Sequence, residues 1–223
     1  GAIERDPAQL LIVDHLDELA VTLNQRGIAS KGSALGWLFH KSRPEPPKGA
    51  YIWGFVGRGK TMLMDLMLES APLSKKRRMH FQTFMADIHH RIHDYRMRVK
   101  SGDVKDSDPI PPVARAIVDE ITLLCLDEFS VTDIADAMIL ARLFDSLFES
   151  GMVLVTTSNI EPERLYEGGL NRTLFLPFID ILKSATTIVE LDAPHDYRLD
   201  KVSEDRTYFS PDDDQAVRAM DHL

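Results

Sequence analysis

The segment GFVGRGKT, residues 54–61, has the residue types and spacing of a phosphate-binding loop. It fits the pattern G-x-x-x-x-G-K-[ST], in which glycines let backbone amides surround phosphate oxygens at the start of a helix. Lys60 would neutralise the outer phosphates, and the hydroxyl of Thr61 could coordinate Mg²⁺. An ordinary glycine-rich turn is the alternative interpretation. The nucleotide-binding residues predicted from this loop are Gly54, Val56, Gly57, Arg58, Gly59, Lys60, Thr61 and Met62.

Polar residues also follow two apolar runs further along the chain. Asp127 and Glu128 come after the run LLCL, and Asn159 follows VLVTTS. If both runs are parallel strands, these side chains meet at the edge of the sheet where ligands bind. Asp127 would then hold Mg²⁺, Glu128 would take a proton from the attacking water, and Asn159 would orient that water or sense the terminal phosphate. Helix capping is the alternative role for the acidic pair, and a cap or turn for Asn159.

Strand and helix patterns alternate along the chain and position these motifs. The expected strands are 51–55, 77–81, 121–129, 152–159 and 186–192. The expected helices are 8–27, 61–71, 83–100, 113–119, 133–150 and 172–184, with irregular segments at 42–49 and 101–112. This alternation predicts an α/β fold with a parallel five-stranded sheet between helices, as in phosphate-loop nucleoside triphosphatases.

Composition limits the classes of protein that this chain can belong to. The net charge of −9 argues against broad binding to a nucleic-acid backbone. The basic cluster KKRR, residues 75–78, is predicted to be a solvated turn before a strand. No apolar run approaches the length of a membrane span, and the start GAIERDPAQ lacks the pattern of a signal peptide. The single Cys125 excludes an intrachain disulfide, so we expect a cytoplasmic protein that is at most peripherally attached to a membrane.

Longer strings carry a family resemblance. KGAYIWGFVGRGKTMLMDL, DEFSVTDIADAMIL and NRTLFLPFI together resemble the ZapE family of AAA+ ATPases, which is related to mitochondrial Afg-type ATPases. The resemblance implies an ATP-driven ring or partial ring. It also implies a bacterial division role through the tubulin-like division protein, or protein quality control in mitochondria. The absence of guanine (N-K-x-D) and transporter (L-S-G-G-Q) signatures favours adenine nucleotide.

The resemblance also assigns residues and domains. It implies nucleotide and metal roles for Lys60 and Thr61, metal and water roles for Asp127 and Glu128, and a sensor role for Asn159. Arg172 matches the arginine that reaches a neighbouring subunit's nucleotide, and a surface ion pair or helix-end cation is its alternative role. The expected domains are an N-terminal helix and linker at 1–49, an AAA+ core at 50–198, and an incomplete helical lid at 199–223. The family's lid arginine has no clear counterpart, because Arg198 is a poor substitute.

Two weaker features complete the sequence-based expectations. His89 and His93 are four residues apart on an expected helix, but no third metal ligand is suggested. Phe81, Phe84 and Met85 could form a gripping loop in a ring's central pore, although core packing is the more frequent role. The predicted function is an ATP hydrolase that remodels a partner protein. The alternatives are an ATP-gated switch with little turnover and a nucleic-acid loader of the same superfamily.

Overall fold

The fold is built on a parallel five-stranded sheet, seen in a computed structural model that describes residues 7–32 and 46–191. The strand order is β2-β3-β4-β1-β5. The strands are β1 (Gly49–Trp53), β2 (Lys76–His80), β3 (Leu123–Asp127), β4 (Val153–Ser158) and β5 (Thr186–Glu190). The predicted α/β fold with a parallel five-stranded sheet is therefore confirmed.

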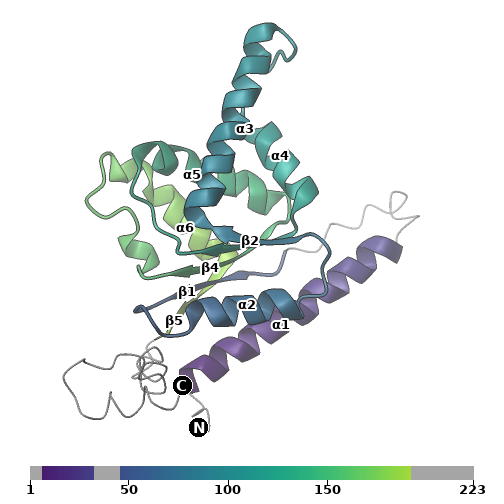
Figure 1. Ribbon diagram of the computed structural model, residues 1–223, viewed down its shortest axis with the longest axis vertical. Helices are drawn as coiled ribbons and strands as arrows, with labels where there is room; N and C mark the ends of the chain where they lie inside the picture. The colour runs from purple at the N-terminus through teal and green to yellow at the C-terminus, as the bar shows by residue number, and fades with distance from the viewer. Residues whose placement is uncertain (1–6, 33–45, 192–223) are drawn as a thin grey trace, which may run out of the picture.

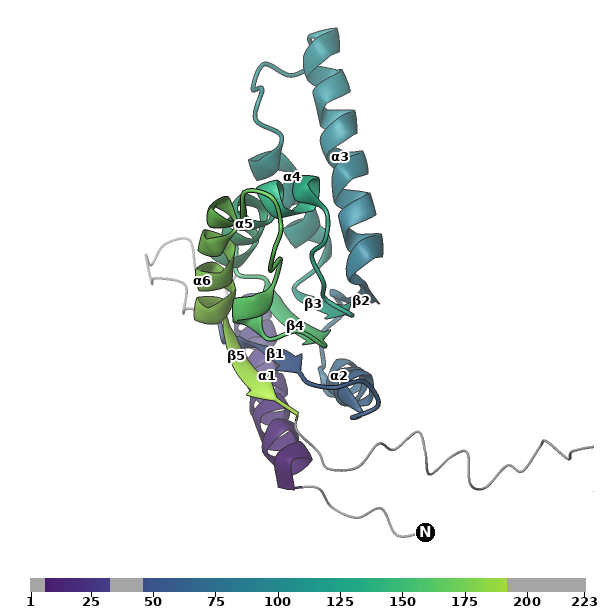
Figure 2. The same ribbon diagram turned by 90° about the vertical axis from the view of Figure 1, so that its left-hand side faces the viewer.

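Helices cover both faces of this sheet (Figures 1 and 2). One face carries α1 (Pro7–Gly32) and α2 (Lys60–Ser70). The other carries four helices, α3 (Phe81–Ser101), α4 (Ile110–Glu120), α5 (Ile134–Glu149) and α6 (Leu176–Ala185). Two short 3-10 helices, η1 (Pro162–Arg164) and η2 (Arg172–Leu174), lie between β4 and α6.

The run LLCL, residues 123–126 in the central strand β3, is apolar without interruption because both faces of that strand are buried. Successive side chains of β3 alternate between two cores: Leu123 and Cys125 pack beneath α1 and α2, whereas Leu124 and Leu126 pack beneath the other helices. Every residue of β3 and β4 is buried. A strand buried on both faces has no polar side, which is typical of parallel sheets. Burial also raises the pKa of the Cys125 thiol to about 12.

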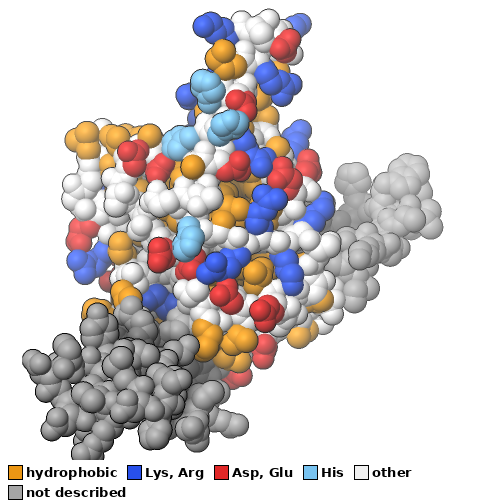
Figure 3. Space-filling view, viewed as in Figure 1, with side chains coloured by type: hydrophobic (Ala, Val, Ile, Leu, Met, Phe, Trp, Pro, Cys, Tyr) orange, Lys and Arg blue, Asp and Glu red, His pale blue; other side chains and the backbone are white. Residues whose placement is uncertain are grey.

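Helix α3 extends well beyond the sheet (Figure 1). Its last buried residue is Ile92, so roughly its final two turns have no core to pack against. Figure 3 shows Lys, Arg and His side chains along this projecting part. No helix in the described ranges 7–32 and 46–191 is long and apolar enough to cross a membrane.

Several element boundaries differ from those expected. Helix α1 continues through Gly27 to Gly32. Helix α4 begins at Ile110 rather than 113, because Pro111 and Pro112 fit its first turn, where backbone N–H groups have no helical partner. The expected helix 172–184 is divided into η2 and α6.

Two other sequence-based predictions are settled by burial or position, and a third concerns residues outside the described ranges. Phe81, Phe84 and Met85 are each at most 1% exposed, so the pore-loop hypothesis is wrong and the core role is confirmed. The expected turn at 75–78 is also wrong, because residues from Lys76 onward belong to β2. The predicted lid at 199–223, together with Arg198, lies outside the described residues.

Candidate functional site

The phosphate-binding motif forms the connection between β1 and α2. The loop leaves the sheet after Trp53, and α2 begins at Lys60. Gly59 caps the helix with φ 81°, a left-handed conformation that glycine adopts without steric cost. The loop is anchored to the neighbouring strand because the backbone N–H of Gly54 donates to the carbonyl of Ser158 at 3.2 Å. Strand, loop and helix therefore follow in the order that a phosphate-binding loop requires.

Lys60 connects the loop to the end of β4. Its Nζ donates to the carbonyl oxygens of Gly54 at 2.8 Å and Phe55 at 2.7 Å, and to Oδ1 of Asn159 at 2.9 Å. Lys60 is only 8% exposed. These acceptors hold the ammonium group at the mouth of the loop, where a phosphate group would meet it.

Asn159 has a fixed position because hydrogen bonds to the next residue, Ile160, hold the chain after β4 in place. The hydroxyl of Tyr51 donates to the carbonyl of Ile160 at 2.8 Å. Burial raises the pKa of Tyr51, so this hydroxyl remains a neutral donor. The neighbouring backbone N–H of Ile160 donates to the Ser158 hydroxyl at 3.0 Å. Asn159 itself is exposed and can contact a ligand.

Asp127 is the buried carboxylate of the site, at 3% exposure. Its Oδ1 accepts from the Thr61 hydroxyl at 3.1 Å, from the Thr157 hydroxyl, and from the backbone N–H of Glu128 at 3.2 Å. Its Oδ2 accepts from Arg78 at 2.7 Å. The side chains of Thr61 and Asp127, which the sequence places 66 residues apart, are therefore in direct contact.

Glu128 differs from Asp127 in both conformation and exposure. Its φ is 55°, a left-handed conformation that is uncommon for residues other than glycine. Its side chain is 77% exposed, with Oε2 at 3.8 Å from Nδ1 of His80. Tyr166 and Asn171 have the same backbone conformation, so the proposed role of Glu128 rests on its exposure beside Asp127.

The donor set at this edge of the sheet suits a magnesium–nucleotide complex. The hydroxyl of Thr61 and the carboxylate of Asp127 are hard oxygen ligands of the type that Mg²⁺ prefers. The loop and the N-terminus of α2 supply backbone N–H groups of the type that bind phosphate oxygens. The residues present therefore fit both the nucleotide and the metal.

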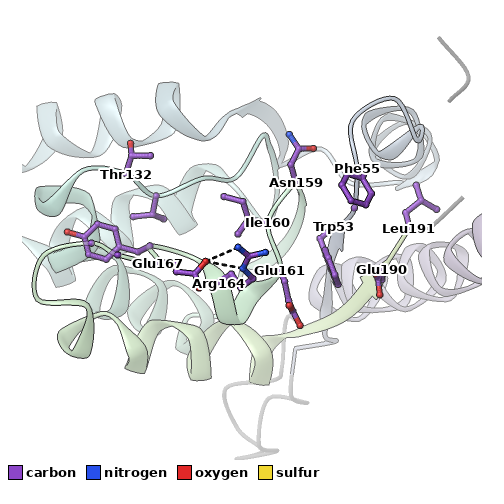
Figure 4. Close-up of a pocket in the computed structure, with 15 residues that line it drawn as sticks. Trp53, Phe55, Thr132, Asn159, Ile160, Glu161, Arg164, Glu167, Glu190 and Leu191 are labelled. Carbon is purple, nitrogen blue, oxygen red and sulfur yellow. Dashed lines mark hydrogen bonds and ion pairs between the residues drawn. The ribbon is translucent and has the colours of Figure 1, made fainter. Parts of the chain in front are cut away.

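A cavity of about 750 Å³ lies beside the phosphate-binding loop (Figure 4). Trp53 and Phe55 line one side, and Ile160 and Arg164 line the other. Arg164 forms an ion pair with Glu167 at 2.9 Å. The cavity continues the candidate site on the side of β1 and β5, because its lining also includes Asn159 and Leu191.

Arg172 lies in a segment separate from this cluster. It begins η2, and its guanidinium donates to the carbonyl of Glu163. The neighbouring Leu170 and Leu174 are 69% and 61% exposed. The structure therefore brings together Lys60, Thr61, Asp127, Glu128 and Asn159, whereas Arg172 contacts Glu163 and has exposed leucines beside it in the sequence.

The remaining loop residues also have defined positions. Val56 and Met62 are 52% and 54% exposed beside the loop, and Arg58 is partly buried. Two further residues, Arg78 and Thr157, contact Asp127 and were not predicted from the sequence. Each of these residues lies in a strand that pairs with β3, and the sequence alone does not show that pairing.

The contacts of His89 are with a neighbouring helix. Within residues 7–32 and 46–191, no group of three or more potential ligands of the His, Cys, Asp or Glu type comes together. His89 instead contacts Asp136 of α5, with 2.6 Å between Nε2 and Oδ1. This contact joins α3 to α5 and gives the buried Asp136 a partner.

Comparison with known proteins identifies the family. The family model described as AFG1-like ATPase matches residues 1–223. This chain belongs to the AFG1-like ATPase family. It is 47% identical over 186 residues to Lactation elevated protein 1 homolog B of Danio rerio, covering 80% of this chain and 37% of the relative. It is 42% identical over 178 residues to the cell division protein ZapE of Escherichia coli K12, covering 80% and 45%.

A solved structure supports the fold assignment. AMPPCP-bound DnaA from Aquifex aeolicus matches with a TM-score of 0.51 at 15% identity, covering 94% of this chain and 56% of that protein. The fold is therefore that of the P-loop AAA+ class. This chain spans less than half the length of the two relatives.

Proposed function

We propose that this chain binds ATP with Mg²⁺ and hydrolyses it as an AAA+ ATPase. The observation that carries the proposal is the convergence of two sequence motifs at one edge of the sheet. Lys60 lies 2.9 Å from Asn159, and Thr61 lies 3.1 Å from Asp127. A glycine-rich turn that binds no ligand would not need the buried Lys60 at its end or the buried Asp127 beside it.

Each residue of the cluster has one proposed role. Lys60 binds the outer phosphates, and Thr61 and Asp127 hold the metal ion. Glu128 is exposed at the same edge and accepts the proton of the attacking water, while Asn159 orients that water. When bound, Mg²⁺ would offset the charge that develops on the phosphoryl oxygens during transfer.

We further propose that the chain assembles head to tail with copies of itself. Exposed apolar side chains lie in the phosphate loop at Phe55 and Val56 and in the following helix at Met62 and Leu66. A second exposed apolar group surrounds Arg172 at Leu170, Leu174 and Leu176. Two different apolar surfaces on one chain support a heterologous contact, in which Arg172 of one copy reaches the nucleotide of the next.

The substrate in this proposal is a partner protein that changes conformation or assembly when ATP is hydrolysed. The similarity to a bacterial cell division protein supports a division-associated partner in the cytoplasm or at the division site. The overall charge of −9 disfavours nucleic acid as the partner.

Equilibrium binding of ATP to Lys60→Ala tests the nucleotide assignment. The variant should lose at least about tenfold in ATP affinity, because the phosphates lose their charge partner. Lys75→Ala is a matched control, since Lys75 is exposed and its Nζ donates to the carbonyl of Asp119. The control should bind ATP like the wild type. Retention of affinity by Lys60→Ala within about threefold would remove the nucleotide assignment.

A further inference from the structure

Arg78 lies between two carboxylates that belong to different elements. On one side, its NH2 is 2.7 Å from Oδ2 of Asp127 in β3. On the other side, its Nε forms an ion pair with Oδ1 of Asp65 in α2 at 2.6 Å, without the geometry of a hydrogen bond. The guanidinium therefore joins the helix that follows the phosphate loop to the strand that carries the buried carboxylate.

The side chains of Asp127, Arg78 and Asp65 differ in how much of their surface is exposed to solvent. The side chain of Asp127 is 4% exposed, compared with 31% for Arg78 and 43% for Asp65. A buried carboxylate without a countercharge is strongly unfavourable. The other groups that contact Asp127 are two hydroxyls and a backbone N–H, all of them neutral. Within the described part of the chain, the salt bridge from Arg78 supplies the positive charge that Asp127 needs.

We propose that Arg78 is the resident countercharge of Asp127 and that it sets the order in which the ligands bind. This inference rests on the proposed role of Asp127 in holding Mg²⁺. While the guanidinium is paired with Asp127, a free divalent cation meets both a neutralised carboxylate and a fixed positive charge. Binding of Mg²⁺ alone is therefore weak, and the metal ion binds together with the negatively charged phosphates of the nucleotide.

Asp65 gives Arg78 a second partner when the metal ion is present. The guanidinium is already in contact with Asp65, so weakening its contact with Asp127 does not leave it unpaired. A forked guanidinium can bind both carboxylates at once or favour one of them. Arg78 is accordingly a positioning residue, because it acts on the metal site through Asp127.

Calorimetric titration with Mg²⁺ alone, without nucleotide, tests this proposal. Arg78→Gln removes the charge and keeps an amide that can donate to Oδ2. We expect it to bind Mg²⁺ at least about tenfold more tightly than the wild type, because the competing positive charge is lost. Arg77→Gln is the matched control. It removes the same charge from the adjacent position of β2, where Arg77 pairs with Glu120 at 3.7 Å.

Comparison of the two variants shows whether Mg²⁺ affinity depends on the charge beside Asp127 or on the net charge of the chain. Arg77→Gln should stay within about threefold of the wild type, since its charge lies on the other side of the strand's pleat. Unchanged Mg²⁺ affinity in Arg78→Gln overturns the proposal. Equal tightening in both variants also overturns it, because the effect would then follow net charge.

A folding measurement keeps the test decisive if Arg78→Gln is unstable. Circular dichroism at increasing Mg²⁺ should then show recovery of the fold, because the metal ion replaces the lost countercharge. Absence of recovery overturns the proposal. The proposed function fails separately if ATP binding by the wild type shows no dependence on Mg²⁺, because Asp127 would then hold no metal.

Discussion

The two buried charged residues of the candidate site, Lys60 and Asp127, each contact several neighbouring groups. Lys60 contacts three oxygen acceptors, and Asp127 contacts Arg78 together with three neutral donors. These contacts fix both side chains in place, which lowers the entropy that nucleotide binding must offset. At the residue scale, the nucleotide and the metal ion therefore replace some of these partners, while Lys60 and Asp127 keep their positions.

The left-handed backbone of Glu128 leads to a prediction about stability. Its φ of 55° brings Cβ close to the backbone, a conflict that glycine avoids. Glu128→Gly should therefore be more stable than Glu128→Ala by about 1 kcal/mol, although both variants lose the same carboxylate. Denaturant unfolding of the two variants measures this difference. Equal stability, or a more stable alanine variant, would show that the conformation carries no strain.

The residues of the site could be predicted from the sequence where one short motif contains them. Lys60 and Thr61 belong to such a motif, and Asp127 ends an apolar run that is typical of a buried strand. Arg78 could not be predicted, because a run of four basic residues also fits a solvated turn. Its contact with Asp127 depends on the pairing of β2 with β3, which brings residues 49 positions apart together.

At the scale of elements, close contact between β1 and β4 requires glycine at the start of β1. A Cβ at Gly49 would lie 1.8 Å from the carbonyl oxygen of Leu154. Gly49→Ala should therefore destabilise the fold by about 3 kcal/mol, because the two strands must move apart. Thermal or denaturant unfolding measures this cost.

Gly102 provides the matched control for this substitution. It has φ 85°, but an added Cβ would meet nothing within 4 Å. Gly102→Ala should cost only about 1 kcal/mol, from the backbone conformation alone. If the two alanine variants are equally stable, the close approach of β1 to β4 is not required.

The type and order of the elements could be predicted better than their ends. Alternation of apolar runs and amphipathic segments is a strong signal for a parallel sheet between helices, whereas the strand order β2-β3-β4-β1-β5 was not predicted. The ends depend on tertiary packing, which a single sequence does not show. Gly27 was expected to end the first helix, yet α1 continues beyond it to Gly32. Pro111 and Pro112 were expected in a loop, yet they lie in the first turn of α4.

At the scale of the whole molecule, the two exposed apolar surfaces predict a shared active site. Arg172→Ala and Lys60→Ala should each be inactive, because one lacks the arginine and the other lacks the phosphate-binding lysine. Mixing them in equal amounts should restore turnover, since about one interface in four of a head-to-tail assembly then has both intact. Phosphate release measures the recovery.

A purely structural role for Arg172 gives a different outcome. Its contact with the carbonyl of Glu163 would then stabilise the segment before α6, so Arg172→Ala would unfold more easily. No rescue would follow from mixing. Absence of recovery in mixtures that demonstrably co-assemble would show that Arg172 does not serve a neighbouring copy.

The most direct test of the central claim measures ATP binding and ATP hydrolysis by Glu128→Gln on the same preparation. The substitution removes the proton acceptor and leaves Lys60, Thr61 and Asp127 in place. The account predicts ATP affinity within about threefold of the wild type, and hydrolysis slower by about 10²-fold or more. Undiminished hydrolysis would contradict the account, because another group would then activate the water.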